Sequence, residues 1–310
     1  MKFRKYASAV LAVCCLAGMT ACGSSSGSSE TTTTTAASAD TSAAASDAGS
    51  AESEETSAAA DNSAYADKVL KVGVKDSVIG FGYKDPLSGE YSGMEVELAK
   101  KIADSLGFKD VEFTTVTAAT RTELLDSGDL DCVIATFTIT DERKKSWDFS
   151  TPYYTDAVTV LVETADGITN VDGLVGKKIG VSTGSTSAYN LAKTMSEKGL
   201  FGDYTVPESS ADFDISSFNE GGTTFEQFGD YPAISNAMAA GTVDAFCVDK
   251  SILANFKTDD RSYIEDTFAP QEYGVATKKG SELSAPIDSL ISTWLEDGTI
   301  DAYIAEFGLE

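Results

Sequence analysis

The sequence predicts an α/β protein with two lobes and a ligand cleft between them. Short apolar runs that are typical of buried strands alternate with helical periodicity, first over residues 69–136 and again over residues 177–249. Extended segments near residues 153–157 and 268–273 join the two series. Because ligands of open α/β sheets bind beyond the carboxyl ends of the strands, we expect the site where the two lobes face each other.

The first series predicts a parallel sheet covered by helices. Met94, Leu98 and Ile102 recur on one side of a helix that we expect to pack on this sheet. The segment LDCVIAT is a nearly continuous apolar run, which is typical of a strand buried on both faces. The predicted order of strand, helix, strand, helix and strand covers residues 69–75, 93–108, 111–116, 121–127 and 130–136.

The second series and the end of the chain complete the predicted lobes. The weakly patterned segment 201–222 is interpreted as a surface insertion. Lobe 1 is assigned to residues 67–154 and 273–310, and lobe 2 to residues 155–272. Further strands are expected at residues 157–163, 177–183 and 243–249, and amphipathic helices at residues 283–295 and 300–307.

The amino-terminal residues have the pattern of an export signal. Lys2, Arg4 and Lys5 precede a short apolar core that is too short to span a membrane, and small residues precede Cys22. The segment MTAC resembles the lipobox of bacterial lipoproteins. This resemblance implies that residues 1–21 are a signal peptide and that Cys22 is lipidated. An ordinary secretory signal with a bystander cysteine is the alternative.

Residues 22–66 are predicted to form a disordered acidic tether. Between residues 23 and 64 there is no aromatic, large aliphatic or basic residue, so this segment cannot bury a core. A flexible chain of this length spans roughly 35–40 Å. We therefore expect a globular part that is held near the cell membrane by a lipid anchor, on its extracellular or periplasmic face.

The composition excludes several classes of function. The formal net charge is −26, which disfavours binding to nucleic acid or to an anionic lipid surface. The chain contains no histidine, so Ser-His-Asp and Cys-His catalysis are excluded and the commonest transition-metal ligand is missing. We predict no metal site and no cofactor. Cys132 and Cys247 lie in apolar runs and are expected to be buried free thiols.

The segment ATFTITDERKK, residues 135–145, predicts a receptor for a carboxylate. Thr140 is a good N-cap for a helix whose first turn contains Arg143. The guanidinium of Arg143 and the amide and hydroxyl of Thr138 can then converge beyond the end of the preceding strand. In the alternative interpretation, Arg143 only forms a salt bridge on an exposed helix.

Three motifs in this order, GMEVELAKKIA, ATFTITDERKK and DFSTPYY, resemble the family 3 extracellular solute-binding proteins of ABC importers. The resemblance covers residues 68–310, and several segments look most like the aspartate/glutamate-binding branch. It implies a two-lobed periplasmic-binding-protein fold of type II that captures a small-molecule amino acid and delivers it to ABC permease subunits. We expect a monomer that is not an enzyme.

The same resemblance implies which residues bind the backbone of an amino acid. Arg143, helped by Thr138, would bind the α-carboxylate, and the backbone carbonyl near Thr136 would accept from the α-ammonium group. Asp249 would pair with the same ammonium group when the lobes close. Asp249 could instead be a strand-terminal capping residue.

On the second lobe, the amides of Ser185 and Thr186 lie where the sequence GST opens a helix, so they can add donors to the ligand carboxylate. Lys75 and Arg121 follow strands of the first lobe, and both could direct cations toward a ligand side-chain carboxylate. The alternatives are a solvated strand end for Lys75 and a helix-terminal salt bridge for Arg121. Phe81 could form an apolar wall or belong to the core, as could Tyr83.

The expected ligand is therefore glutamate or aspartate, with glutamine or cystine as alternatives. Binding would proceed by hinge closure at residues 153–157 and 268–273. A cyclohexadienyl-dehydratase-like enzyme shares this fold and is the main competing class, and a ligand sensor or adhesin is a third class.

Overall fold

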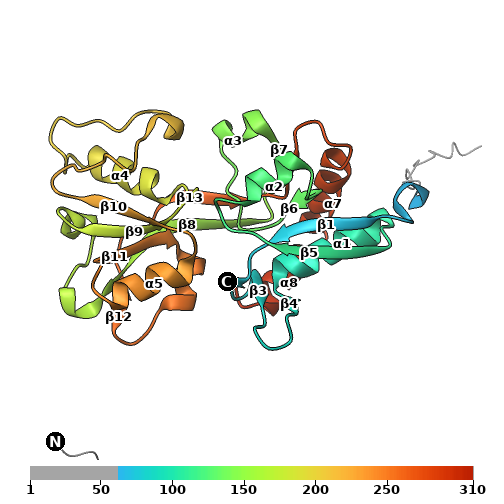
Figure 1. Ribbon diagram of the computed structural model, residues 1–310, viewed down its shortest axis with the longest axis horizontal. Coiled ribbons are helices and arrows are strands. Elements are labelled where there is room, and N and C mark those ends of the chain that lie inside the picture. Colours follow the sequence, from blue (N-terminus) through green and yellow to red (C-terminus); the bar gives the residue numbers. More distant parts are fainter. Residues whose placement is uncertain (1–61, 310) are drawn as a thin grey trace, which may run out of the picture. The chain divides into compact units, whose positions relative to one another are not determined.

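The structure is a computed structural model that describes residues 62–309. The expected signal peptide (1–21), the lipidation site Cys22 and nearly all of the expected tether (22–66) lie outside these described residues. The described residues form a mixed α/β protein built on two main sheets, as the alternation of strands and helices predicted. We use lobe 1 for the part built on the sheet that contains β1, and lobe 2 for the part built on the sheet that contains β8 (Figure 1).

Lobe 1 contains a five-stranded sheet in the order β5-β1-β6-β14-β7. Strand β1 pairs in parallel with β5 and with β6, which confirms the predicted parallel arrangement. Strand β14 is antiparallel to both β6 and β7. The strands are β1 (Val69–Val74), β5 (Asp110–Thr115), β6 (Cys132–Val133), β7 (Trp147–Phe149) and β14 (Ala276–Lys278).

The helices of lobe 1 cover this sheet. The predicted apolar stripe of α1, formed by Met94, Leu98 and Ile102, is fully buried, and α1 contacts β1 and β5 (Figure 1). A small sheet that the sequence did not predict comprises β2 (Ser77–Val78), β3 (Gly82–Lys84) and β4 (Tyr91–Ser92). The helices are η1 (Asn62–Tyr65), α1 (Met94–Leu106), α2 (Arg121–Ser127), α3 (Asp141–Ser146), α7 (Ser284–Glu296) and α8 (Thr299–Glu306).

Lobe 2 contains a sheet in the order β10-β9-β11-β8-β12, with β13 also paired to β8. Strands β10, β9 and β11 are mutually parallel, whereas β8 is antiparallel to β11, β12 and β13. The strands are β8 (Tyr154–Glu163), β9 (Lys178–Ser182), β10 (Thr224–Phe228), β11 (Ala245–Asp249), β12 (Arg261–Tyr263) and β13 (Phe268–Tyr273). The helices are η2 (Thr164–Asp166), η3 (Val171–Leu174), α4 (Ser187–Glu197), η4 (Ser210–Asp212), α5 (Tyr231–Ala239), α6 (Lys250–Leu253) and η5 (Ala254–Phe256).

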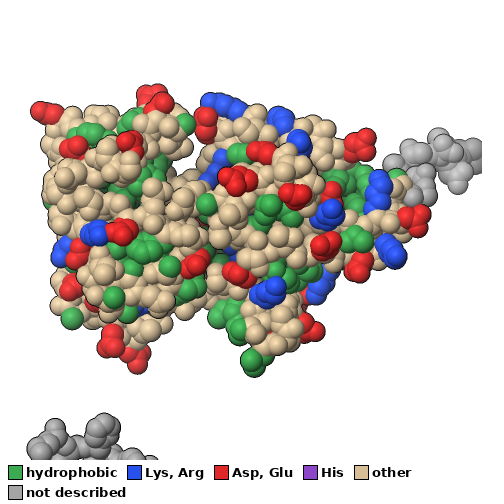
Figure 2. Space-filling model, in the orientation of Figure 1, with side chains coloured by type: hydrophobic (Ala, Val, Ile, Leu, Met, Phe, Trp, Pro, Cys, Tyr) green, Lys and Arg blue, Asp and Glu red, His purple; other side chains and the backbone are tan. Residues whose placement is uncertain are grey.

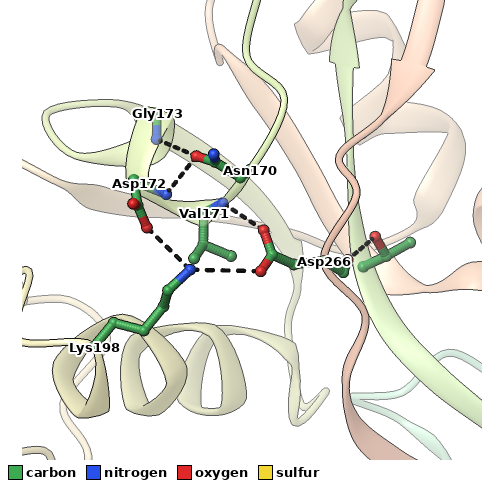
Figure 3. A network of polar contacts seen from close by, with 7 residues as sticks. Asn170, Val171, Asp172, Gly173, Lys198 and Asp266 are labelled. Atoms are coloured by element: carbon green, nitrogen blue, oxygen red, sulfur yellow. Dashed lines mark hydrogen bonds and ion pairs between the residues drawn. The ribbon is translucent and has the colours of Figure 1, made fainter.

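One polar network fastens the end of α4 to the turn around η3 (Figure 3). The ammonium group of Lys198 lies 3.0 Å from Asp172 and 3.5 Å from Asp266. The other carboxylate oxygen of Asp266 accepts a hydrogen bond from the Val171 amide, at 2.9 Å. Because these ion pairs are solvent-exposed, we expect each to contribute less than about 1 kcal/mol to stability. The network therefore holds α4 and η3 together within lobe 2 and includes none of the predicted site residues.

The chain passes between the two sheets through the segments that lead into β8 and out of β13. These two strands pair in antiparallel register, with Tyr154 opposite Tyr273. The expected crossings at residues 153–157 and 268–273 therefore coincide with paired strands rather than with separate loops. Any change in the angle between the lobes must bend this two-stranded connection.

The predicted strand at residues 130–136 is shorter than expected, because only Cys132 and Val133 pair in the ladder. Thr136 has a φ angle of 44°, in the left-handed region that ends an extended strand. Its amide donates to the carboxylate of Glu95, at 2.6 Å, instead of to a neighbouring strand. This interaction joins residues 41 positions apart, so no local pattern indicates it.

The segment 201–222 has its own apolar anchor on lobe 2. Its side chains Phe201, Val206, Phe213 and Phe218 are buried with the lobe 2 core. The hydroxyl of Tyr189 on α4 donates to a backbone carbonyl of the segment, at 2.6 Å. The interpretation as a weakly patterned surface insertion missed this aromatic packing, since the four residues follow neither a helical nor a strand period.

Two further observations concern the described residues. Cys132 and Cys247 are both buried and free, as predicted. No helix within residues 62–309 combines the length and the apolar character needed to cross a membrane.

The start of α1 depends on Gly93, and this dependence is testable. Gly93 has a φ of 120°, and a Cβ atom there would overlap with the carbonyl oxygen of Phe81. We expect Gly93→Ala to lower the free energy of unfolding by about 3 kcal/mol or more, from backbone strain and overlap together. Urea denaturation followed by circular dichroism measures this loss.

Gly128 provides the matched control, because its φ is 83° but no atom lies within 4 Å of the place that an added Cβ would take. Gly128→Ala should cost only about 1–2 kcal/mol, from backbone conformation alone. Equal losses for the two variants would contradict the close approach at Gly93.

Candidate functional site

The residues predicted to bind a ligand come together where the strands of the two lobes end. One small cavity contains every predicted site residue except Lys75 in its wall. The residues from lobe 1 are Ala118, Arg121, Thr136, Thr138 and Arg143, and those from lobe 2 are Ser185, Thr186, Ser187, Tyr231, Val248 and Asp249. The predicted convergence of residues that are up to 128 positions apart is thus present in the structure.

Arg143 reaches from lobe 1 to lobe 2. Thr140 caps α3 as predicted, because its hydroxyl accepts from the Arg143 amide at 3.1 Å. The guanidinium donates to the carbonyl oxygen of Thr138 at 2.8 Å and to that of Gly184 at 3.1 Å. Among the described residues no carboxylate forms an ion pair with Arg143, so the alternative of a surface salt bridge is not found. Burial lowers the pKa of Arg143 to about 9, so it stays charged at neutral pH.

Arg121 is a buried cation, with only 3% of its surface exposed. Its guanidinium stacks 3.7 Å above the ring of Phe137 and donates to the carbonyl oxygens of Ala135 and Thr136. Its Nε atom is buried without a hydrogen-bond partner among residues 62–309. The alternative of a salt bridge at the start of α2 is not what the structure contains. The buried, incompletely paired guanidinium retains donor capacity toward the cavity.

Lys75 lies just behind this cavity, at the end of β1. It is only 3% exposed, and its ammonium group sits 5.2 Å from the centre of the Tyr231 ring, so it is not a solvated strand end. Burial and the nearby Arg121 lower the pKa of Lys75 to about 7. The carboxylates that oppose this shift are Glu95, Asp76 and Asp249.

Asp249 is the last residue of β11 and is 5% exposed. Its side chain makes no capping bond to α6, and instead accepts from the hydroxyl of Tyr273 at 2.5 Å. The capping alternative is therefore not found. Burial, together with the nearby Asp156, raises the pKa of Asp249 to about 7, while Tyr273, Arg121 and Arg143 oppose the rise. An acid with this pKa is sensitive to any cation that enters the cavity.

The hydroxyls of Thr138 and Thr186 meet on one acceptor. Both donate to the side-chain oxygen of Gln271 on β13, at 2.8 and 2.9 Å. The amide of Ser185 donates to the carbonyl of Ser182, at 3.1 Å, which closes a tight turn before α4. The expectation that the Ser185 amide is a free donor is therefore wrong in this arrangement, although Ser185 lines the cavity.

Several residues of this region were not predicted. Glu95, Gln271, Tyr231 and Tyr273 contact predicted site residues directly or lie against them. Glu95 had a signal in the sequence, because it is an acid on the helical side of α1 that also carries buried apolar residues at positions 98, 99 and 102. Phe81 is part of the core, with its ring packed on Tyr154 and Tyr273, and neither Phe81 nor Tyr83 lines the cavity.

The cavity is nearly closed in this structure. Its volume is about 10 Å³, which is comparable to the space that one water molecule needs. Hollows of about 460 and 480 Å³ adjoin it on the Arg143 side and the Thr138 side. An amino acid can enter only if the lobes move apart or the side chains rearrange. No group of three or more potential metal ligands occurs within the described part of the chain.

Comparison with known proteins assigns the chain to a family. Residues 70–310 match the bacterial extracellular solute-binding proteins, family 3. The chain belongs to this family. The resemblance of the three motifs is thereby confirmed, and the two-lobed type II fold is shared with solved amino-acid-binding proteins.

The relatives of this family 3 protein are named as binding proteins. The ABC transporter glutamine-binding protein GlnH of Bacillus subtilis (strain 168) is 34% identical over 241 residues, covering 76% of this chain and 79% of the relative. The L-cystine-binding protein TcyJ of Escherichia coli (strain K12) is 30% identical, with 75% and 80% coverage. An ancestral arginine-binding protein bound to arginine superposes with a TM-score of 0.64 at 30% identity, covering 77% of this chain and 97% of that structure.

Surface charge does not mark the site of this family 3 protein. On the face shown in Figure 2, acidic side chains are scattered over the surface rather than gathered at one opening. The strong negative charge of the chain would oppose the approach of an anion at long range. Recognition of an anionic group must therefore depend on the buried cations at short range.

Gly184 is predicted to permit the close approach of the lobes. A Cβ atom at Gly184 would lie 2.7 Å from the carbonyl oxygen of Ala118 on the other lobe, and the φ of Gly184 is 77°. We expect Gly184→Ala to hold the lobes apart and to increase the radius of gyration measured by small-angle X-ray scattering.

Gly199, also in lobe 2, has a φ of 75° and no atom within 4 Å of the added Cβ, so Gly199→Ala controls for the backbone conformation. An unchanged radius of gyration in Gly184→Ala would mean that the close approach of the lobes does not require a glycine at this position.

Proposed function

We propose that this protein captures glutamate or aspartate outside the cell by hinge closure and delivers it to the permease of an ABC importer. The observation that carries the proposal is the charge of the cavity wall. Two cations, Arg121 and Arg143, share the cavity wall with one carboxylate, Asp249. The third cation, Lys75, lies 5.2 Å from the centre of the Tyr231 ring, which belongs to the same wall. An acidic amino acid has two carboxylates and one ammonium group, and so has the complementary charges.

The backbone of the amino acid would be held between the lobes. Arg143 on lobe 1 would bind the α-carboxylate through two parallel hydrogen bonds. The hydroxyls of Thr138 and Thr186 would become further donors by turning from Gln271 to the ligand. Asp249 on lobe 2 would bind the ammonium group, together with the carbonyl of Thr136. Hydrogen bonds to charged groups contribute about 1.5–3 kcal/mol each, so these groups supply most of the preference for a zwitterion.

The ligand side chain would be selected by Arg121 and Lys75. The wall has an excess of one positive charge, so a neutral amino acid leaves a buried cation without compensation, at a cost of several kcal/mol. A side-chain carboxylate removes this cost. Relatives named for glutamine and cystine make these the competing ligands, and the cations of this chain argue against them.

The remaining features support a binding protein rather than an enzyme. The chain has no histidine for general acid-base chemistry, and the relatives carry names of binding proteins. The signal at residues 1–21 and Cys22 support a lipid anchor on the outer face of the cell membrane. A monomer with an anchored, closing cleft is suited to deliver its ligand to permease subunits.

A calorimetric panel tests the ligand. At pH 7, L-glutamate or L-aspartate should bind at least about tenfold more tightly than L-glutamine or L-cystine. Lys75→Met, which keeps the length and apolar stem of the side chain, should weaken glutamate binding about 10–100-fold while leaving glutamine binding nearly unchanged. Tighter binding of glutamine than of glutamate by the natural protein would reject the proposal.

The affinity for glutamate should depend on pH in a bell shape. Below pH 7, Asp249 gains a proton and no longer attracts the ligand ammonium group, because its pKa is about 7. Above pH 7, Lys75 loses its proton and no longer attracts the side-chain carboxylate, because its pKa is also about 7. The affinity should therefore peak near neutrality and fall by up to about tenfold per pH unit on each side.

Titrations from pH 5.5 to pH 8.5 measure both limbs. The charged groups that act on Lys75 are Arg121, Glu95, Asp76 and Asp249. Those that act on Asp249 are Asp156, Tyr273, Arg121 and Arg143. Lys75→Met should lose the alkaline limb and keep the acidic one. An affinity that stays constant between pH 7 and pH 8.5 in the natural protein would exclude Lys75 from ligand binding.

A further inference from the structure

Glu95 is a fully buried carboxylate outside the set of residues proposed to touch the ligand. It lies in the first turn of α1 and has no exposed surface. One oxygen accepts two short hydrogen bonds, from the Thr136 amide and from the Tyr153 hydroxyl, each at 2.6 Å. The other oxygen is buried and has no hydrogen-bond partner within residues 62–309. A carboxylate oxygen without a partner is costly to bury, so its presence calls for an explanation.

The first consequence of this arrangement concerns the backbone at Thr136. This residue adopts a left-handed conformation, with φ 44°, which costs a non-glycine residue about 1–2 kcal/mol. Glu95 accepts a hydrogen bond from the Thr136 amide, and Arg121 donates to the carbonyl oxygens of Ala135, at 2.9 Å, and of Thr136, at 3.3 Å. Thr136 lines the cavity, so Glu95 determines where its carbonyl and side chain lie.

The second consequence is electrostatic. Among the carboxylates near Lys75, Glu95 has the largest effect in favour of the charged ammonium form, ahead of Asp76 and Asp249. Arg121 acts in the opposite direction, and the Tyr231 ring lies beside the ammonium group. Burial raises the pKa of Glu95, while its two hydrogen-bond donors, Lys75 and Arg121 oppose the rise. The Thr136 amide and the Tyr153 hydroxyl both donate to the same oxygen, and two donors on one oxygen stabilise the anionic carboxylate.

We propose that Glu95 is a positioning residue of the binding site, which holds Thr136 in its left-handed conformation and supplies a negative charge to the buried cluster that contains Lys75, the partner of an acidic ligand side chain. This inference rests on the proposed binding of glutamate or aspartate. It adds a specificity determinant that is supplied by helix α1 and that never contacts the ligand.

Glu95→Gln tests the charge separately from the hydrogen bonds. A glutamine oxygen can still accept from Thr136 and Tyr153, but the negative charge is gone. Because the charged form of Lys75 then loses a favourable negative charge nearby, the pKa of Lys75 should fall by about one unit. The affinity for glutamate at pH 7 should fall about fivefold. The alkaline limb of the glutamate affinity profile should move to lower pH by the same interval. The affinity for glutamine should stay nearly unchanged.

Glu97→Gln is the matched control on the same helix turn. Glu97 pairs with Lys100 on the surface, at 2.7 Å, so its substitution should leave both the affinity and the pH profile unchanged. Lys75→Met/Glu95→Gln should bind glutamate no more weakly than Lys75→Met alone, because the charge of Glu95 acts through Lys75. An additive loss in the double variant would contradict the proposed route.

Tyr153→Phe provides a second variant that retains Glu95 if Glu95→Gln does not fold. It removes the hydroxyl that stabilises the anionic carboxylate, so the alkaline limb should shift in the same direction by a smaller amount. A natural profile with an alkaline limb that neither variant moves would overturn the role of Glu95 and leave glutamate binding intact. A natural profile without that limb would instead overturn the ligand proposal.

Discussion

The structure depends on the burial of opposite charges where the strands of two lobes end. Lys75, Arg121, Glu95 and Asp249 are buried and Arg143 is half-buried beside them. No simple ion pair within the described residues neutralises any of the three cations. Isolated charges in such a place cost several kcal/mol each, so the cluster persists only because carbonyl oxygens, aromatic rings and distant carboxylates compensate in part. The incomplete compensation leaves capacity for a charged ligand.

In the proposed function, the division of the cluster between the lobes would link ligand binding to lobe movement. Arg143 belongs to lobe 1 and Asp249 to lobe 2, and the guanidinium already bonds to Gly184 across the cleft. A zwitterion that bridges these two residues interacts with both only when the lobes are close. Its binding free energy therefore includes a term that favours closure, which is the requirement for a ligand-driven change of conformation. The paired strands β8 and β13 are the connection that must bend.

Much of the fold and part of the site could be predicted from local sequence patterns. The alternation of strands and helices indicated the parallel pairing of β1, and Thr140 indicated the cap that orients Arg143. The early end of β6 could not be predicted, because it depends on the contact of Thr136 with Glu95, far away in the sequence. The burial of Lys75 could not be predicted either, since a cation at a strand end is usually solvated and the Tyr231 ring beside it comes from a distant part of the sequence.

The most direct test of the central claim is a crystal structure of the protein grown with L-glutamate. The electron density should contain one amino acid enclosed between the lobes, with its α-carboxylate within about 3.2 Å of the Arg143 guanidinium and its ammonium group at a similar distance from Asp249. A ligand bound elsewhere, or one that contacts only a single lobe in this cleft, would contradict the account.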